Sequence, residues 1–261
     1  MDARLAGLAL ASLVLLAGCS ASAPPPPPQR HHHRVQRQLS YLLDDEFSGK
    51  TDSPPGRDWH YNLGSTGYGP SQLQDYTRSS AYQDGHGHLV IAVTRTGGSY
   101  YSARLVSDAS FTEGDTLAAR IRLPAQVGFW PAWWLLGDHW PAGGEVDMVE
   151  DYGNATVQTT VHTPSGPAKM YSMAAQLSGS AGWHTWEVAW TAAGFTFSRD
   201  GQTYLTVTPG EMRNWGYNSG AAMHMVLNVA VGGIAGTPSP SAKFPVTMEV
   251  DWVRAWRGNQ K

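Results

Sequence analysis

The chain has 261 residues with a formal net charge of −3, and only 15% of its residues are charged. This balance gives no reason to expect the basic face of a nucleic-acid binder. Hydrophobic residues make up 41%, enough for a sizeable core, and 29 glycines with 17 prolines favour a turn-rich β protein. Eleven tryptophans are many for this length. Those outside the core would offer stacking surfaces for sugars or other flat ligands.

The first 19 residues resemble the signal of a bacterial lipoprotein. A 13-residue apolar run from Leu5 to Ala17 is too short to span a bilayer and has the size of a signal-peptide core. Cys19, the only cysteine, follows it in LAGC, which resembles the lipobox that is cleaved before a lipid-modified cysteine. We expect a signal peptide at 1–18 and an exported protein that Cys19 anchors to a membrane of the cell envelope. The alternatives are an ordinary signal peptide and a buried apolar segment.

Residues 19–39 are poor in apolar side chains and contain five consecutive prolines, Pro24–Pro28. Such a run forms a stiff polyproline II segment, which predicts a spacer between the membrane and a domain. The run His31–His33 lies beside arginines, and a solvated linker explains it more simply than a metal site does.

From residue 40 to about 258, apolar residues alternate with period two between turn-forming residues, which predicts strands at 88–95 and 116–124. Residues 128–137, GFWPAWWLLG, come next. As a strand they place Trp130 and Trp134 on one face and Trp133 on the other. The first two would form a platform for sugar rings, and Trp133 would enter the core. The alternative is that all three are core residues.

Residues 145–150 read EVDMVE. Strand alternation places Glu145 and Asp147 on one side and leaves Glu150 out of step. If Met148 is the extra residue of a β-bulge, all three carboxylates share one face and the two valines point into the core. Bulges are over-represented beside active sites, so the pattern predicts a site at this strand.

Carboxylates about 7 Å apart along a strand repel each other, so at least one of them should have a raised pKa. Glycosidic cleavage needs such a pair, with one group ionised to attack the anomeric carbon and the other protonated for the leaving oxygen. A separation of roughly 5 Å predicts a retaining, two-step route. The alternatives are a charged strand edge at a solvated rim and a calcium-binding acidic cluster.

The later part of the chain continues the strand pattern. Further strands are predicted at 184–191, 194–199, 203–207, 223–233 and 246–257. Asp200-Gly201 predicts a tight hairpin turn between two of them. Many short strands without a helical period predict one all-β domain, a sandwich of two antiparallel sheets.

EVDMVE resembles the bulged E-x-D-x-x-E signature of glycoside hydrolase family 16, found in bacterial laminarinases (endo-β-1,3-glucanases) and in agar- and galactan-cleaving relatives. The resemblance covers nearly the whole domain. Its other blocks are DDEFSG, YSARL, FTEGDTLAARIRLP, WPAWWLLG, VHTPSG, WHTWEVAWTAAGFTFSRDGQ, LNVAVGG and VDWVRAW. It implies a concanavalin A-like β-jelly-roll with an open sugar-binding cleft on the concave face.

The resemblance also implies roles for the acids. Glu145 would be the nucleophile and Glu150 the general acid/base. Asp147 would hydrogen-bond the nucleophile and balance charge through the cycle. No cofactor is implied for this chemistry. A structural calcium is implied by Glu46 and Asp251, which match calcium-holding positions of some relatives, although no further ligands are identified.

Six further residues match family positions that bind sugar or lie near the acids. They are Trp130, Trp134, Arg104, His162, Gln74 and Asn228. A surface ion pair is the alternative for Arg104, and a satisfied strand histidine is the alternative for His162.

Two substrate-contacting loops depart from the family pattern. Relatives often carry Asn and Glu where this chain has Ser71 and Gln72, and many laminarinases have an aromatic where it reads GGIAGTP. Both departures bear on the choice of polymer and leave the catalytic strand intact.

The sequence therefore predicts a lipid-anchored, monomeric, retaining endo-glycanase that acts on β-1,3-glucan. The first rival is a galactan- or agar-type hydrolase, or a transglycosylase, with the same catalytic residues. The second rival is a non-catalytic glycan-binding lipoprotein, because fold does not imply function. The three intact acids argue against this second rival, since a lectin has no use for a mutually repelling trio.

Overall fold

The computed structural model describes residues 40–65, 69, 71–164, 172–218 and 220–258. The predicted signal peptide, Cys19 and the linker up to residue 39 lie outside these ranges and stay predictions. Within the described ranges, no helix is both long and apolar enough to cross a membrane.

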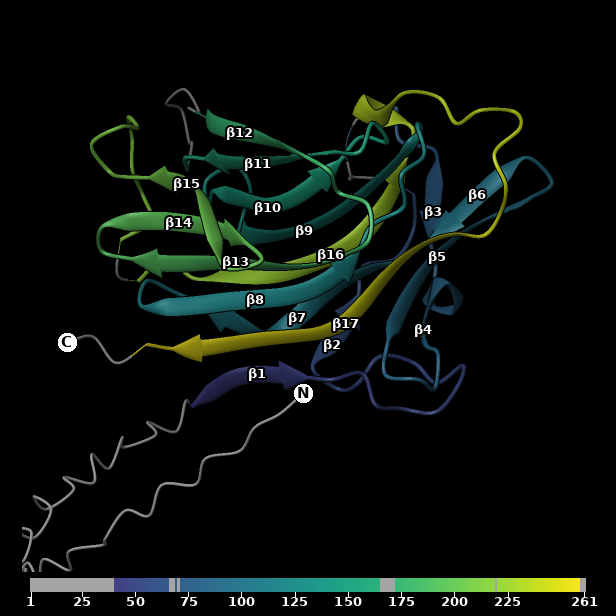
Figure 1. The fold of residues 1–261 in the computed structure, drawn as a ribbon, viewed down its shortest axis with the longest axis horizontal. Helices are drawn as coiled ribbons and strands as arrows, with labels where there is room; N and C mark the ends of the chain where they lie inside the picture. The colour runs from purple at the N-terminus through teal and green to yellow at the C-terminus, as the bar shows by residue number, and fades with distance from the viewer. Residues whose placement is uncertain (1–39, 66–68, 70, 165–171, 219, 259–261) are drawn as a thin grey trace, which may run out of the picture. The chain divides into compact units, whose positions relative to one another are not determined.

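The domain consists of two sheets (Figure 1). The first contains β1 (Tyr41–Asp45), β3 (Gln74–Tyr76), β4 (Ala81–Gln83), β5 (Leu89–Thr96), β6 (Ser99–Ser102), β8 (Asp115–Arg122), β13 (Trp183–Thr191), β14 (Gly194–Arg199), β15 (Gln202–Val207) and β17 (Val246–Arg257). Its order is β15-β14-β13-β8-β17-β5-β6-β3, with β1 paired to β17 and β4 paired to β5. Within this sheet β3 and β6 run parallel, and the other pairs run antiparallel.

The second sheet is antiparallel throughout. It contains β2 (Trp59–Tyr61), β7 (Arg104–Phe111), β9 (Phe129–Gly137), β10 (Glu145–Asp151), β11 (Thr156–His162), β12 (Ser172–Ser178) and β16 (Met223–Val231). Its order is β12-β11-β10-β9-β16-β7-β2, which places β16 and β7, distant in sequence, beside the consecutive strands β9 and β10. The helices of the described residues are two 3₁₀ turns, η1 (Arg78–Ser80) and η2 (Gly233–Ala235).

The all-β sandwich is confirmed, and each strand predicted from periodicity is present. The predicted hairpin turn between β14 and β15 is present too. Asp200 has φ 52 and Gly201 has φ 77. Two consecutive positive φ angles are the requirement of a type I′ turn, which matches the twist of the flanking strands.

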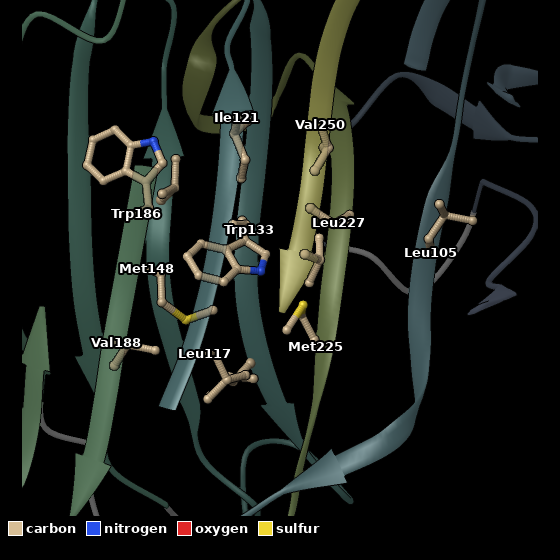
Figure 2. Packing of buried hydrophobic residues seen from close by; sticks show 14 of the residues in the cluster. Leu105, Leu117, Ile121, Trp133, Met148, Trp186, Val188, Met225, Leu227 and Val250 are labelled. Atoms are coloured by element: carbon tan, nitrogen blue, oxygen red, sulfur yellow. The ribbon is translucent and has the colours of Figure 1, made fainter. Parts of the chain in front are cut away.

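The core lies between the sheets, where alternate side chains of both meet (Figure 2). Ile121 and Val250 come from the ten-stranded sheet, and Trp133 and Met148 from the seven-stranded one; each is at most 1% exposed. Trp133 therefore occupies the core, as its alternation predicts. Burying a side chain of this size contributes roughly 4–6 kcal/mol of hydrophobic free energy.

Candidate active site

Strand β10 contains the bulge that the sequence predicts. Against β9, Asp147 pairs with Trp134 and Val149 pairs with Trp133, so Met148 is the extra residue. The register against β11 shifts at the same point. The shift returns Glu150 to the face that carries Glu145 and Asp147, because a bulge redirects the side chains that follow it.

The bulge leaves the carbonyl of Met148 outside the sheet ladder, and a buried carbonyl without a partner would be costly. The Thr159 hydroxyl donates to this carbonyl at 2.8 Å. Thr159 is 1% exposed and lies 2.7 Å from the hydroxyl of Tyr204, which approaches the same carbonyl at 3.5 Å. Hydroxyl groups from β11 and β15 therefore stabilise the bulge in β10.

The three acids line a cleft of about 290 Å³ on the face of the seven-stranded sheet away from the core. Side chains from β7, β9, β10 and β16 form most of its wall. The lining residues are Gly69, Gln72, Tyr76, Arg104, Trp130, Ala132, Trp134, Leu136, Trp140, Glu145, Asp147, Glu150, Asn228 and Ala230. Of the six further residues matched to the family, four line the cleft. Those four are Trp130, Trp134, Arg104 and Asn228.

Glu150 is 7% exposed, and both of its carboxylate oxygens have partners. The indole N–H of Trp130 donates to Oε1 at 2.8 Å, and the hydroxyl of Tyr152 donates to Oε2 at 3.2 Å. Burial is the main cause that raises the pKa of Glu150 well above its usual range, and the charge of Asp147 adds to it. The two donors act in the opposite direction without cancelling the rise. Burial thus favours the protonated form, which is the form that a general acid needs.

Asp147 is 2% exposed, and its pKa is also raised well above its usual range. Burial is the main cause, followed by the charge of Glu145 and a hydrogen bond with it. The Nε2 atom of His162 lies 3.1 Å from Oδ2 of Asp147, and its Nδ1 lies 2.6 Å from the hydroxyl of Ser172. The Ser172 hydroxyl can donate to Nδ1, whereas Oδ2 of Asp147 is buried without a hydrogen-bond partner among the described residues. Protonated Asp147 can then donate to the carboxylate of Glu145.

Glu145, at the start of β10, is the half-buried member of the trio. Its backbone N–H donates to the hydroxyl of Tyr217 at 3.0 Å, and the same hydroxyl lies 3.0 Å from its carbonyl. Tyr217 also contacts the carbonyl of His162 on β11. Gly144 lies so close that an added Cβ would be 2.6 Å from the Tyr217 hydroxyl. The buried Tyr217 therefore fixes the backbone of Glu145, whose side chain lines the cleft.

The aromatic wall beside the acids is held by polar contacts. The indole N–H of Trp134 donates to Oδ1 of Asn228 at 2.8 Å, and the amide of Asn228 donates to the Tyr76 hydroxyl at 3.4 Å. The Arg104 guanidinium lies over the Trp134 ring at 4.6 Å, and its Nε donates to Asn62 at 3.2 Å. The alternative of a surface ion pair for Arg104 does not fit, because Arg104 is 8% exposed and faces the cleft.

The structure places Gln74 behind the cleft wall instead of in it. Gln74 is 1% exposed, its Oε1 accepts from the Val231 backbone at 2.7 Å, and its Nε2 donates to Gln72 at 2.8 Å. Gln72, noted in the sequence only as a departure from the family, lines the cleft. Any effect of Gln74 on substrate would therefore pass through Gln72.

Three residues of the site were not anticipated. Tyr152 directly follows the acidic strand, and Trp140 lies in the loop before it. Both residues are therefore close in sequence to the EVDMVE motif. Tyr217 is 72 residues from Glu145 in sequence, and no local pattern marks it.

The donor atoms of Glu145, Asp147 and His162 lie within 4.8 Å of one another, a spacing that could hold a metal ion. Within this cluster Asp147 hydrogen-bonds to Glu145, and Nδ1 of His162 lies 2.6 Å from the Ser172 hydroxyl. The expected calcium ligands have arginine partners: Glu46 contacts Arg254, and Asp251 lies 2.5 Å from Arg120. The two-carboxylate chemistry itself uses no cofactor.

Known proteins resemble this chain in sequence and in structure. A family model of XgeA-like catalytic GH16 domains matches residues 71–202. A β-glucanase of Rhodothermus marinus is 32% identical over 249 residues, which cover 83% of this chain and 84% of the relative. The chain belongs to glycoside hydrolase family 16. It is thus a glycosidase with the family's jelly-roll fold.

Two further relatives carry different descriptions. A glucan endo-1,3-β-glucosidase of Cryptopygus antarcticus is 29% identical over 258 residues, covering 84% of this chain and 93% of the relative. The crystal structure of an immunostimulatory antigen and pseudo β-1,3-glucanase of Mycobacterium tuberculosis is 32% identical, with a TM-score of 0.74. It covers 84% of this chain and 99% of the mycobacterial one.

Proposed function

We propose that this glycosidase is an endo-acting, retaining enzyme that cleaves β-1,3-glucan, with Glu145 as nucleophile and Glu150 as general acid/base. One observation carries the proposal. A bulged strand presents a half-buried Glu145 and an enclosed Glu150 to the same cleft, and the pKa of Glu150 is raised. Two carboxyl groups in such different environments suit opposite protonation states.

In the first step Glu145 attacks the anomeric carbon while Glu150 gives its proton to the departing glycosidic oxygen. A covalent glycosyl–Glu145 intermediate forms, and the shortened chain leaves. As the nucleophile loses its charge, Asp147 no longer has an anionic partner to accept its hydrogen bond. In the second step Glu150, now ionised, takes a proton from water, and the water oxygen displaces Glu145.

The polymer is proposed from the relatives and the wall of the cleft. The relatives named above include a β-glucanase and an endo-1,3-β-glucosidase. Trp130 and Trp134 offer rings for stacking, and the cleft lies on a sheet face, which suits binding within a long chain. Gln72 lines the cleft, and Ile234 in the η2 turn is 65% exposed. At these two positions the chain departs from typical laminarinases, so they would give it a different polymer preference.

The proposal is tested by reducing-end release from laminarin, mixed-linkage β-glucan, agarose and an arabinogalactan. Glu145→Gln is compared with the unchanged chain on each polymer. We expect activity on laminarin, β-anomeric products by NMR at early times, and a loss of more than 100-fold in the variant, because the nucleophile is absent. Retention of more than a few per cent of the activity in Glu145→Gln would remove the assigned role, and α-anomeric first products would exclude the retaining route.

The same panel distinguishes the rival functions. Activity on agarose or arabinogalactan alone would indicate the galactan-type enzyme. The pseudo-glucanase among the relatives favours a binding protein as the second candidate. That candidate predicts retention of laminarin on an affinity gel, with no turnover in either the unchanged chain or Glu145→Gln.

We also propose that lipid on Cys19 tethers the enzyme to a membrane of the bacterial cell envelope, with residues 19–39 as the spacer. The lipobox-like LAGC and the proline run support this. Metabolic labelling with a fatty acid and detergent partitioning would test it. Cys19→Ser should lose both the label and the detergent-phase partitioning; an unlabelled unchanged chain would contradict the proposal.

A further inference from the structure

The two oxygens of Glu150 have partners of different chemistry. Oε1 accepts from the indole N–H of Trp130 at 2.8 Å, and Oε2 lies 3.2 Å from the hydroxyl of Tyr152. An indole N–H can only donate a hydrogen bond, whereas a phenol hydroxyl can donate or accept. The two contacts are therefore not equivalent when the carboxyl group gains a proton.

A general acid/base alternates between a protonated and an ionised form. The ionised form accepts at both oxygens, and both Trp130 and Tyr152 can supply a hydrogen. The protonated form has one O–H donor and one acceptor oxygen. Because Trp130 cannot accept, a proton on Oε1 would oppose its N–H, so the proton belongs on Oε2. Tyr152 can then turn its hydroxyl and accept from Oε2.

We infer that Tyr152 is a positioning residue that keeps the proton of Glu150 on Oε2. Trp130 donates to Oε1, so this oxygen stays a hydrogen-bond acceptor. The inference rests on the acid/base role proposed for Glu150. In the first step the Oε2 proton passes to the glycosidic oxygen as its bond to the anomeric carbon breaks. In the second step a water proton returns to Oε2 as the water oxygen bonds to that carbon.

The surroundings of Tyr152 fit a fixed position. Its ring meets the Trp130 ring edge-on, with centroids 5.6 Å apart. On its N-terminal side Asp151 is fully buried and accepts from Ser180 at 2.5 Å and from the Gly153 backbone at 2.6 Å. On its C-terminal side Gly153 packs so closely that an added Cβ would lie 2.3 Å from the carbonyl of Gln126. The backbone on both sides of Tyr152 is thus fixed, and mainly its hydroxyl is free to turn.

The effect of Tyr152 on proton transfer has a definite sign. Its hydrogen bond lowers the pKa of Glu150, against the rise caused by burial and by Asp147 and Glu145. Further ionisable groups near Glu150 in the described part of the chain are Arg104 from β7, in the same cleft, and His162 from β11, against Asp147. A change confined to the hydroxyl leaves all of these in place. Its loss should move the alkaline limb of kcat/KM to higher pH, because the donor lost to the ionised carboxylate is worth more than the acceptor lost to the neutral carboxyl group.

The test is Tyr152→Phe in the full chain, assayed on laminarin and on an aryl laminarioside whose phenolate leaves without a proton. On laminarin we expect kcat/KM at neutral pH to fall about tenfold and its alkaline limb to shift upward, because general-acid catalysis is impaired. On the aryl substrate kcat/KM should stay within about twofold, because its first step needs no acid. An unshifted alkaline limb, or equal losses on both substrates, would overturn the inference.

Two comparisons separate failure of the inference from failure of the proposed function. Tyr61→Phe removes a half-buried hydroxyl that bonds the Ala81 carbonyl at 3.4 Å outside the cleft lining, and it should leave both assays unchanged. Glu150→Gln should lose laminarin activity. If Glu150→Gln retains it, the proposed acid/base role is wrong; if only Tyr152→Phe behaves like the unchanged chain, the role stands and the inference is wrong.

Discussion

At Glu150 the requirements of the proposed acid/base role oppose those of stability. The side chain is buried beside Asp147, so the charged form is disfavoured and the pKa is raised. A folded state that holds a proton more tightly than the unfolded chain gains stability at low pH. That gain is present below the unfolded pKa, about 4.3 for Glu, and is lost as pH rises through the raised folded pKa. Asp147, also with a raised pKa, adds a decline of the same sign.

Glu150→Gln should therefore flatten the pH dependence of stability. Glutamine has no proton to lose, so the free energy of unfolding should fall less between pH 4 and pH 8 than in the unchanged chain. Urea unfolding at several pH values measures this. Glu113→Gln, in the turn before β8, is the matched control and should follow the unchanged chain. Equal slopes for Glu150→Gln and the unchanged chain would contradict the assignment of a raised pKa.

At the scale of the strand, the bulge in β10 depends on a contact from its neighbour. The carbonyl of Met148, displaced from the ladder, accepts from the Thr159 hydroxyl at 2.8 Å. Valine at 159 would keep the shape and remove the donor. We expect Thr159→Val to lower the free energy of unfolding by about 1–3 kcal/mol, the cost of leaving a buried carbonyl unpaired.

The same variant should also lower kcat, because a relaxed bulge lets Glu150 drift from Glu145. Urea unfolding and laminarin turnover measure the two effects. Thr196→Val on β14, in the other sheet, is the control and should change neither by much. If Thr159→Val keeps both stability and turnover, the hydroxyl does not support the bulge.

At the scale of the whole molecule, the tryptophans divide between the core and the cleft. Trp133 is fully buried between the sheets, whereas Trp140 lines the cleft and is 54% exposed. Trp133→Ala should lower the free energy of unfolding by about 3–5 kcal/mol, through lost burial and a cavity. Trp140→Ala should change it by about 0.5 kcal/mol or less. Thermal unfolding of the two variants compares them directly, and similar losses would contradict this division.

Much of the architecture follows from local patterns. Alternation over 128–137 predicted that Trp133 faces the core while Trp130 and Trp134 face outward, and the structure confirms this. The single step out of register in EVDMVE predicted the bulge at Met148, which is also confirmed. Both succeed because a strand has a period of two, so a residue's face can be counted along the chain.

The contacts between residues of the site could not be predicted by counting along the chain. Gln74 matched a cleft position by sequence, yet in the structure it lies behind the wall and Gln72 reaches the cleft. Tyr217 and Thr159 support the acidic strand from other strands or loops, and their contacts depend on the order of the strands in the sheet. A sequence pattern of period two carries no information about that order.

The sequence by itself thus determined the all-β class, the face on which the acids lie and the family that they indicate, because these depend on neighbours along one strand. Only the tertiary structure decided the environment of each acid. It encloses Glu150 between Trp130 and Tyr152 and leaves Glu145 half-buried. Burial and hydrogen bonds from distant segments shift a pKa, and these exist only once the strands have assembled.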